Sequence, residues 1–176
     1  MKITKFITAL CLTLGSVSVA HAQTTQGEMI LEWQRAKAYT QAYLEAMPES
    51  GYVTKPTTDT RSFAAQFLHL ADTNYGFTAA VTTEKSPYAM GALEKSADQS
   101  KAAVTKNVLA SYDFVIAGIK SLSPAQLAEK TKLFGKFEMT KAMVFAKDFE
   151  HQTHQRAQTA VYLHLAGIKP PAELLF

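Results

Sequence analysis

What this chain most clearly lacks is cysteine. Its 176 residues contain a single one, Cys11, which lies in an apolar N-terminal stretch that we expect to be removed. The rest of the chain therefore cannot form a disulfide, supply a thiolate nucleophile, or bind zinc or an iron–sulfur cluster through sulfur. An exported protein without cysteine is also insensitive to the redox state outside the cytoplasm.

The chain also lacks any strong excess of charge. Losing Lys2 and Lys5 with the N-terminal stretch takes the basic count from 18 to 16, against 15 acidic residues. No run of lysine or arginine forms a stripe, so we predict no binding of nucleic acid through its phosphate backbone. A glycine-rich phosphate loop, a G-x-S-x-G nucleophile turn and an EF-hand loop are absent from the sequence too.

A signal peptide is the expectation for the first 22 residues. Lys2 and Lys5 precede an apolar segment, residues 6–20, which ends in the small-x-small site Ala20-His21-Ala22. This pattern is typical of cleavage after Ala22, and the apolar segment is too short for a stable membrane span. We therefore expect one domain, residues 23–176, that is periplasmic or secreted and free of the membrane after cleavage. The alternative is an N-terminal anchor that is retained.

Helical periodicity dominates the rest of the sequence, because apolar residues recur at three- and four-residue spacing. The four long helices that we predict span residues 28–47, 61–81, 96–122 and 139–166. A further helical turn is expected at Ser123-Pro124, and an irregular or short extended piece at 132–138. No set of strands is strong enough to compete, so the sequence predicts an all-α, single four-helix bundle.

The densest polar cluster lies in the fourth predicted helix. At 3.6 residues per turn, His151 and Gln155 share one side of this helix, while His154 lies about 60° away and His164 about 140° from His151. Two histidines one turn apart can bind one metal ion. The pair His151 and His154 alone is a weak signal, and ordinary surface histidines are the simpler interpretation.

His69 strengthens the case for a site. It lies in the middle of the second predicted helix, among strongly apolar neighbours, and so is expected to face the core. A lone histidine there is more often a satisfied core residue than a ligand. A histidine that faces a second histidine on a neighbouring helix is a better candidate.

Two stretches of the chain resemble the motifs of DinB/YfiT-like proteins. Residues 61–71, RSFAAQFLHLA, resemble the second-helix motif of that family. Residues 150–158, EHQTHQRAQ, followed by 162–171, YLHLAGIKPP, resemble its fourth-helix signature. The resemblance implies a bundle with up-down-down-up helix order. It also implies a divalent metal, such as nickel or zinc, held by one histidine of the second helix and two of the fourth.

Carried over by position, the resemblance assigns His69 and His151 to two of the three ligands. The third ligand position is Gln155, whose neutral amide oxygen is a poorer ligand than imidazole for zinc or nickel. His154 is one residue away and would reach the ion if the helix rotated modestly. Either Asp72 or Asp148 could supply a carboxylate instead. The expected cofactor is a divalent ion: zinc, nickel, iron or manganese.

Three hypotheses for function follow. The first is a metal-dependent hydrolase or transferase of unassigned reaction. The second is a non-catalytic protein that binds a small molecule beside a degenerate metal site. The aromatic residues that we expect to line its pocket are Phe67, Tyr75, Tyr112 and Tyr162. The third is a structural or partner-binding role through a homodimer.

Overall fold

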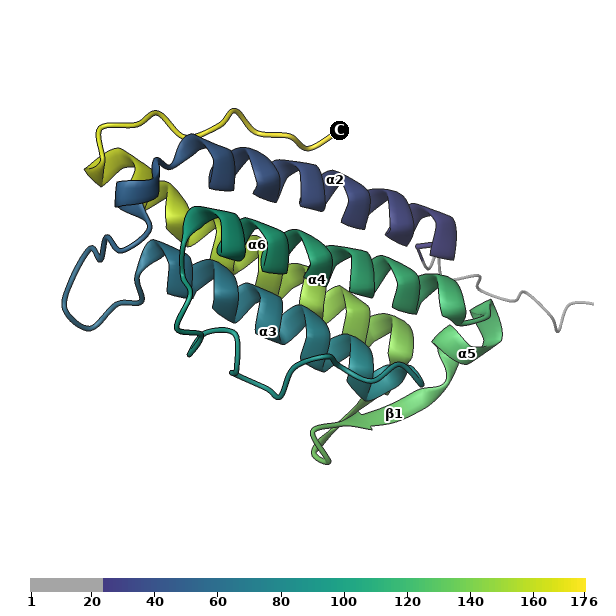
Figure 1. Ribbon diagram of the computed structural model, residues 1–176. Coiled ribbons are helices and arrows are strands. Elements are labelled where there is room, and N and C mark those ends of the chain that lie inside the picture. The colour runs from purple at the N-terminus through teal and green to yellow at the C-terminus, as the bar shows by residue number, and fades with distance from the viewer. Residues whose placement is uncertain (1–23) are drawn as a thin grey trace, which may run out of the picture.

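The computed structural model describes residues 24–176, so the predicted signal peptide, residues 1–22, lies outside the described residues. Four long helices form the body of the protein (Figure 1): α2 Gln26–Ala46, α3 Phe63–Val81, α4 Lys101–Ser121 and α6 Lys141–Leu165. The connections contain a 3-10 turn, η1 Glu49–Gly51, a short helix, α5 Pro124–Ala128, and two strands, β1 Lys130–Leu133 and β2 Phe137–Thr140. None of the described helices is long and apolar enough to span a membrane.

The predicted helices are confirmed, and side-chain caps set where they begin. Thr25 forms a capping box with Glu28 at the start of α2, and Ser62 caps α3 through the amide of Ala65. The third helix begins at Lys101 rather than at residue 96, because the Ser100 side chain accepts from a first-turn amide there. Such caps satisfy backbone donors that have no partner within the helix.

The segment expected to be irregular or extended at 132–138 is part of an antiparallel hairpin. Leu133 of β1 pairs with Phe137 of β2, and Phe134 and Gly135 between them adopt positive φ angles of 51° and 69°. Glycine tolerates this backbone region without steric cost, which favours a tight turn here. The hairpin packs against the end of α3, where the rings of Phe77 and Phe134 meet edge to face.

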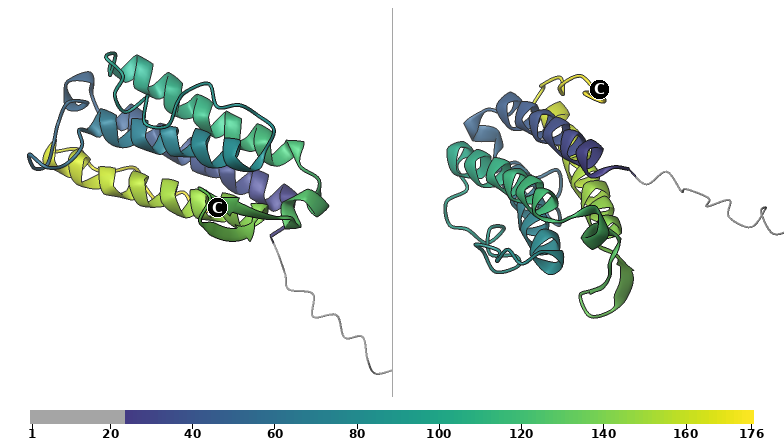
Figure 2. Two further views of the ribbon diagram at one scale, coloured as in Figure 1. Left: turned by 90° about the horizontal axis from the view of Figure 1, so that it is seen from below. Right: turned by 90° about the vertical axis from the view of Figure 1, so that its right-hand side faces the viewer.

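The order of helix directions is up-down-down-up. Figure 1 shows α2 and α6 running one way and α3 and α4 the other way. Residues 82–100, which connect the end of α3 to the start of α4, return along the length of the bundle. Helix α3 packs against both α4 and α6, and α4 also packs against α2, while the seam between α2 and α6 is smaller. The view along the bundle in Figure 2 shows the four helices around one core. Helices α3 and α4 therefore begin at the same end of the molecule.

A buried polar network fixes α6 within the otherwise apolar core. The hydroxyl of Tyr112 lies 2.7 Å from that of Thr40 and donates to Gln152 Oε1 at 2.8 Å. Arg156 donates to the same Gln152 oxygen at 2.8 Å and stacks on the ring of Tyr39 at 4.4 Å. Buried polar groups that are satisfied in this way specify one arrangement of the helices.

Candidate functional site

Two predicted ligands, His69 of α3 and His151 of α6, meet where these antiparallel helices face each other. Their ring centroids lie 5.3 Å apart with an interplanar angle of 64°, and both side chains are half-buried. Two imidazoles that bind one tetrahedral zinc through nitrogens about 2.1 Å from the ion have centroids roughly 5 Å apart. The spacing of this histidine pair is therefore suited to sharing one ion.

The environment of His151 keeps its imidazole neutral. Burial, with smaller effects from the nearby His69, His154 and Arg61, lowers the pKa of His151 to about 4. Its Nδ1 is buried without a hydrogen-bond partner, and its Nε2 lies 3.0 Å from the amide nitrogen of Gln155. A neutral imidazole is the form that binds metal ions.

A carboxylate orients the other histidine. His69 Nδ1 lies 3.0 Å from Glu94 Oε2, and Arg61 Nε donates to Glu94 Oε1 at 2.7 Å. Partial burial raises the pKa of Glu94, but the hydrogen bond and charge of Arg61, together with His69, outweigh it and leave that pKa lowered. A carboxylate on one ring nitrogen fixes the tautomer and points the other nitrogen at a ligand, as in many metal sites.

Glu94 was missed by the sequence prediction, because it lies in the long connection between α3 and α4 and belongs to no motif. The buried carboxylate of Asp72 on α3 brings it into place. Asp72 accepts from the backbone amides of Leu93 at 3.1 Å and Glu94 at 2.9 Å. Asp72 therefore anchors a loop, and no signal in the sequence pairs it with residues 93–94.

Gln155 occupies the position of the third ligand, and its amide takes part in a network of glutamines. Gln66 Nε2 donates to Gln155 Oε1 and also to Gln158 Oε1. The oxygen of Gln155 thus already has a donor, while its nitrogen faces His151. To coordinate an ion beside His151, this amide must turn its oxygen toward the ring.

The alternative ligands are placed elsewhere. His154 is exposed, and its Nε2 lies 2.9 Å from the amide nitrogen of Gln158. Asp148 is fully buried, and neither of its carboxylate oxygens has a hydrogen-bond partner. Within residues 24–176, no group of three or more histidine, cysteine, aspartate or glutamate residues is placed to hold a metal ion. The two imidazoles of His69 and His151 are the donors already placed for an ion, and the amide oxygen of Gln155 joins them only if that amide turns.

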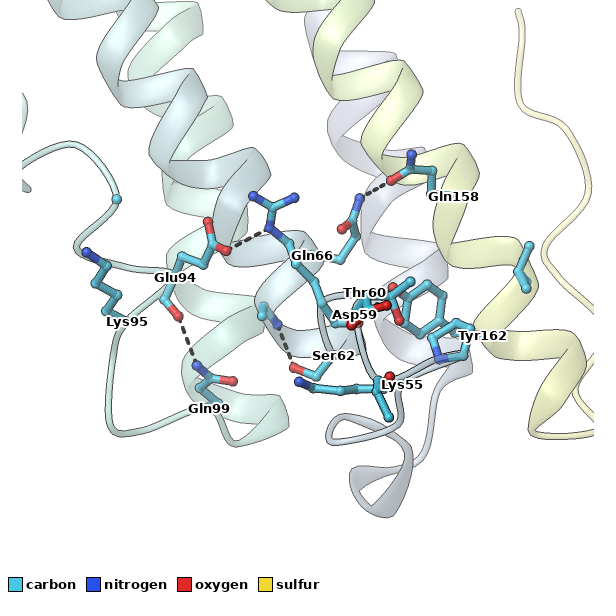
Figure 3. A pocket seen from close by; sticks show the side chains of 16 residues that line it. Lys55, Asp59, Thr60, Ser62, Gln66, Glu94, Lys95, Gln99, Gln158 and Tyr162 are labelled. Carbon is cyan, nitrogen blue, oxygen red and sulfur yellow. Dashed lines mark hydrogen bonds and ion pairs between the residues drawn. The ribbon is translucent and has the colours of Figure 1, made fainter.

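A cleft of about 1030 Å³, whose lining side chains are drawn in Figure 3, opens next to the histidine pair, since its lining residue Glu94 contacts His69. It lies between residues 55–62, the first turn of α3, residues 91–99 and the last turns of α6. Gln66 and Glu94 line this cleft and contact Gln155 and His69, respectively. They therefore link the cleft directly to the candidate metal ligands.

The aromatic pocket expected for a small ligand is not formed. Phe67 and Tyr112 are fully buried in the core, and Tyr75 packs against Tyr88 and Phe114. Tyr162 alone of the four lines the cleft, and its hydroxyl donates to the backbone oxygen of Arg61 at 2.9 Å. The other three had helical spacing that core packing explains.

A family model and several solved structures are similar to this chain. The family model described as the DinB superfamily matches residues 32–159. A DinB-like protein from Bacillus cereus has a TM-score of 0.70 at 14% identity, over 85% of this chain and 98% of that one. The DinB-like protein YjoA from Bacillus subtilis has a TM-score of 0.64 at 17% identity, over 85% and 96%. A comparison with curated proteins gives no match.

A third solved structure carries a functional description. YfiT from Bacillus subtilis, described as a probable metal-dependent hydrolase with an unusual four-helix bundle topology, has a TM-score of 0.64 at 18% identity. The match covers 88% of this chain and 93% of YfiT. At these identities the three solved structures establish the fold alone.

Proposed function

The chain belongs to the DinB superfamily, and from this premise we propose that it binds a divalent metal ion on His69 and His151. One observation carries the proposal: two imidazoles from neighbouring helices lie 5.3 Å apart, one kept neutral by burial and the other oriented by Glu94. We propose Gln155 as the weak third ligand and His154 as its alternative. The expected ion is zinc, nickel, manganese or iron(II).

We further propose that the reaction is a hydrolysis, with group transfer as the alternative. The description of YfiT as a probable metal-dependent hydrolase supports this choice. A divalent ion bound here supplies Lewis-acid assistance by polarising a carbonyl or phosphoryl oxygen. The residues of the chain provide the rest: Glu94 holds the tautomer of His69, burial keeps His151 unprotonated, and the amide oxygen of Gln155 reaches the ion once it leaves its hydrogen bond from Gln66.

Metal content of the purified protein tests the proposal. Protein stripped with chelator and offered each ion in turn is expected to retain close to one equivalent, as measured by elemental analysis. His69→Ala and His151→Ala should each lose it, whereas His164→Ala, an exposed residue in the last turn of α6, should keep it. Absence of stoichiometric metal in the parent protein under every condition would reject the proposal.

The same measurement decides the third ligand. His154 is exposed and contacts Gln158, so His154→Ala should leave the metal content unchanged if Gln155 is the ligand. Loss of metal in His154→Ala, with Gln155→Ala unaffected, would assign the role to His154 and require α6 to rotate.

A second candidate function is a non-catalytic protein that binds a small molecule beside a degenerate site. The glutamine network favours it, because Gln66 already satisfies the oxygen that the third ligand would need. This candidate predicts a metal-free protein whose melting temperature rises with a small ligand. If the protein binds metal and no ligand in the screen raises its melting temperature, this second candidate is rejected and metal binding remains the proposed function.

Export of the protein is a separate proposal. It rests on the basic start, the apolar segment and the Ala20-His21-Ala22 site of the sequence. Fractionation of cells that make the full chain, followed by N-terminal sequencing, is expected to give a periplasmic or secreted product that begins at Gln23. A membrane-bound product that retains Met1 would instead support the uncleaved anchor.

We also propose that the protein forms a homodimer. An apolar groove of about 380 Å³ between α2 and α6 offers one face for pairing, through the exposed Met143 and the partly buried Met29 and Phe149. Light scattering at increasing concentration is expected to report twice the monomer mass. A constant monomer mass at high concentration would remove this option.

A further inference from the structure

We infer that the cleft beside the histidine pair binds a small molecule through a carboxylate or phosphate group, which is held by the guanidinium of Arg61. The inference rests on the proposed metal site, because it names the class of substrate for that site. The cleft has the size of a small-molecule site, at the upper end of the usual range of about 300–1,000 Å³.

The charges that line the cleft favour an anion. The cleft is lined by three basic residues, Lys55, Arg61 and Lys95, and by two acidic ones, Asp59 and Glu94. Figure 3 labels Lys55, Asp59, Glu94 and Lys95. Glu94 is paired with Arg61, so these two charges offset each other, and Lys55 and Lys95 outnumber the remaining acidic residue, Asp59. The exposed ammonium groups of Lys55 and Lys95 make no ion pair or side-chain hydrogen bond in the part of the chain that the structure describes. Both therefore remain free to attract an anionic ligand.

Arg61 is prepared to bind such a group. Its Nε is fixed by Glu94 at 2.7 Å, and its backbone is fixed by the hydroxyl of Tyr162. Among residues 24–176, neither Nη atom has a hydrogen-bond partner. Two adjacent Nη groups on a fixed, planar guanidinium match the two oxygens of a carboxylate or phosphate. Little side-chain entropy is then lost on binding, since Arg61 is already held in place.

The N-terminus of α3 contributes a positive electrostatic potential to the cleft, but its backbone amides do not serve as hydrogen-bond donors to the anion. The positive end of its dipole points into the cleft, where it stabilises a negative charge. Its first amides are already taken: Phe63 donates to the Thr54 oxygen at 3.0 Å and Ala64 to the Tyr52 oxygen at 2.9 Å. Recognition of the anion therefore depends on side chains, with Arg61 first among them.

The position of Arg61 connects the anion to the metal ligands. Glu94 bridges Arg61 and His69 with its two oxygens. His69 in turn packs against His151, with ring centroids 5.3 Å apart, so a single carboxylate separates Arg61 from the histidine pair. A ligand anchored on Arg61 by its anionic end thus places its neighbouring atoms beside His69 and His151.

The test uses metal-free protein, so that the anion cannot bind to an ion. Inorganic phosphate and acetate serve as probes, followed by two-dimensional ¹H–¹⁵N NMR, with sodium chloride at equal ionic strength as the reference. Saturable shifts are expected at the amides of Ser62, Ala65 and Glu94, which surround the cleft. Arg61→Gln should weaken binding roughly tenfold or more, because it removes a charge-assisted pair.

A matched control separates specific binding from general attraction. Lys120→Gln removes an exposed charge in the last turn of α4, far along the bundle from the cleft, and should leave the shifts unchanged. Equal weakening by Lys120→Gln and Arg61→Gln, or no saturable shift in the parent protein, would overturn the inference. Arg61→Lys keeps the positive charge but loses the two adjacent Nη donors, so its affinity for the anion should lie between those of the parent protein and Arg61→Gln. This variant also tests the inference if Arg61→Gln does not fold.

Failure of the inference is distinguishable from failure of the proposed function. Arg61 is not a proposed metal ligand and reaches His69 only through Glu94, so metal content is compared in the parent protein and in Arg61→Lys, which keeps a positive charge beside Glu94 and should retain the metal. Metal binding without anion binding would reject only the ligand class. Anion binding that depends on Arg61, in a protein that binds no metal, would reject the metal proposal and keep the cleft as a binding site.

Discussion

At the scale of single residues, Gln155 determines how strongly the histidine pair can hold an ion. Its neutral amide oxygen is a weaker donor than imidazole for zinc or nickel. The amide must also give up its present orientation, in which Gln66 donates to the oxygen and His151 faces the nitrogen. The rest of the site is in place, so a single substitution at position 155 should have a large effect on affinity.

Gln155→His is expected to raise the affinity for zinc by about tenfold or more, because it supplies a third imidazole one turn from His151. Competition with a coloured chelator at pH 7.5 measures the change. Gln155→Ala is the matched control, since it removes the amide without adding a donor, and it should bind no more tightly than the parent protein. An unchanged affinity in Gln155→His would show that position 155 does not reach the ion.

Asp148 affects the stability of the fold, because its buried carboxyl group has no hydrogen-bond partner among the described residues. Both of its oxygens are buried and unpaired, and burial raises the pKa of Asp148 well above its ordinary value of 3.8. The folded state therefore holds this proton more tightly than the unfolded state. Stability is not affected below the unfolded pKa, where both states are protonated, and it falls as pH rises above about 4.

Asp148→Asn should remove this pH dependence. The free energy of unfolding of the variant is expected to exceed that of the parent protein by about 1–3 kcal/mol at pH 8, because the amide is neutral in the folded and unfolded states, whereas the buried carboxyl must stay protonated or bury a charge. The two proteins should differ little at pH 4. Urea denaturation at both pH values measures the difference, and a gap that is equal at pH 4 and pH 8 would contradict the assignment.

The sequence predicted the two histidines of the candidate site, but not the residues that hold them in place. His69 and His151 were identified because they match two motifs of the family, whereas spacing alone allowed a simpler interpretation of each. Glu94 and Asp72 do not stand out, because their roles depend on residues 82–100 folding back along α3. Contacts between a loop and a helix leave no periodic pattern, so only the structure reveals them.

At the scale of helices and strands, local signals predicted where elements lie better than how they pack. Ser123 and Pro124 correctly marked the start of α5. The hairpin at Lys130–Thr140 was expected only as an irregular or extended piece, since its two strands have four residues each. The parallel direction of α3 and α4 followed from the family resemblance and not from periodicity.

The close approach of α3 and α4 depends on Gly118. A Cβ atom at this buried position would collide with Cγ2 of Thr78 and lie 3.3 Å from Cγ2 of Thr82. Gly118→Ala should therefore lower the free energy of unfolding by about 1–3 kcal/mol, although alanine favours the helix itself. Gly27→Ala is the control, because its Cβ would have no neighbour nearer than 3.9 Å and should stabilise α2 by up to about 1 kcal/mol. Equal effects of the two substitutions in urea denaturation would contradict the packing argument.

At the scale of the whole molecule, the two ends of the bundle differ in structure. The end at which α3 and α4 begin carries the cleft, and the opposite end carries α5 and the hairpin (Figure 1). Up-down-down-up order produces this division, because the long return of residues 82–100 runs past the histidine pair and delivers Glu94 to it. A bundle with four alternating helices would have short connections and no such segment.

The fold should be complete in residues 23–176, which is the chain expected after cleavage. Thr25 and Glu28 form the capping box of α2, and the Gln26 side chain donates to the backbone oxygens of Ile119 and Leu122 at 2.7 and 2.6 Å. A protein that starts at residue 23 keeps these contacts, and we expect it to unfold cooperatively in urea with a helical circular dichroism spectrum. A protein that starts at residue 28 loses the cap and the Gln26 bonds, which should cost about 1–3 kcal/mol of stability. Equal stability of the two proteins would show that these contacts do not secure α2, and an unfolded 23–176 protein would place part of the fold's support in the first 22 residues.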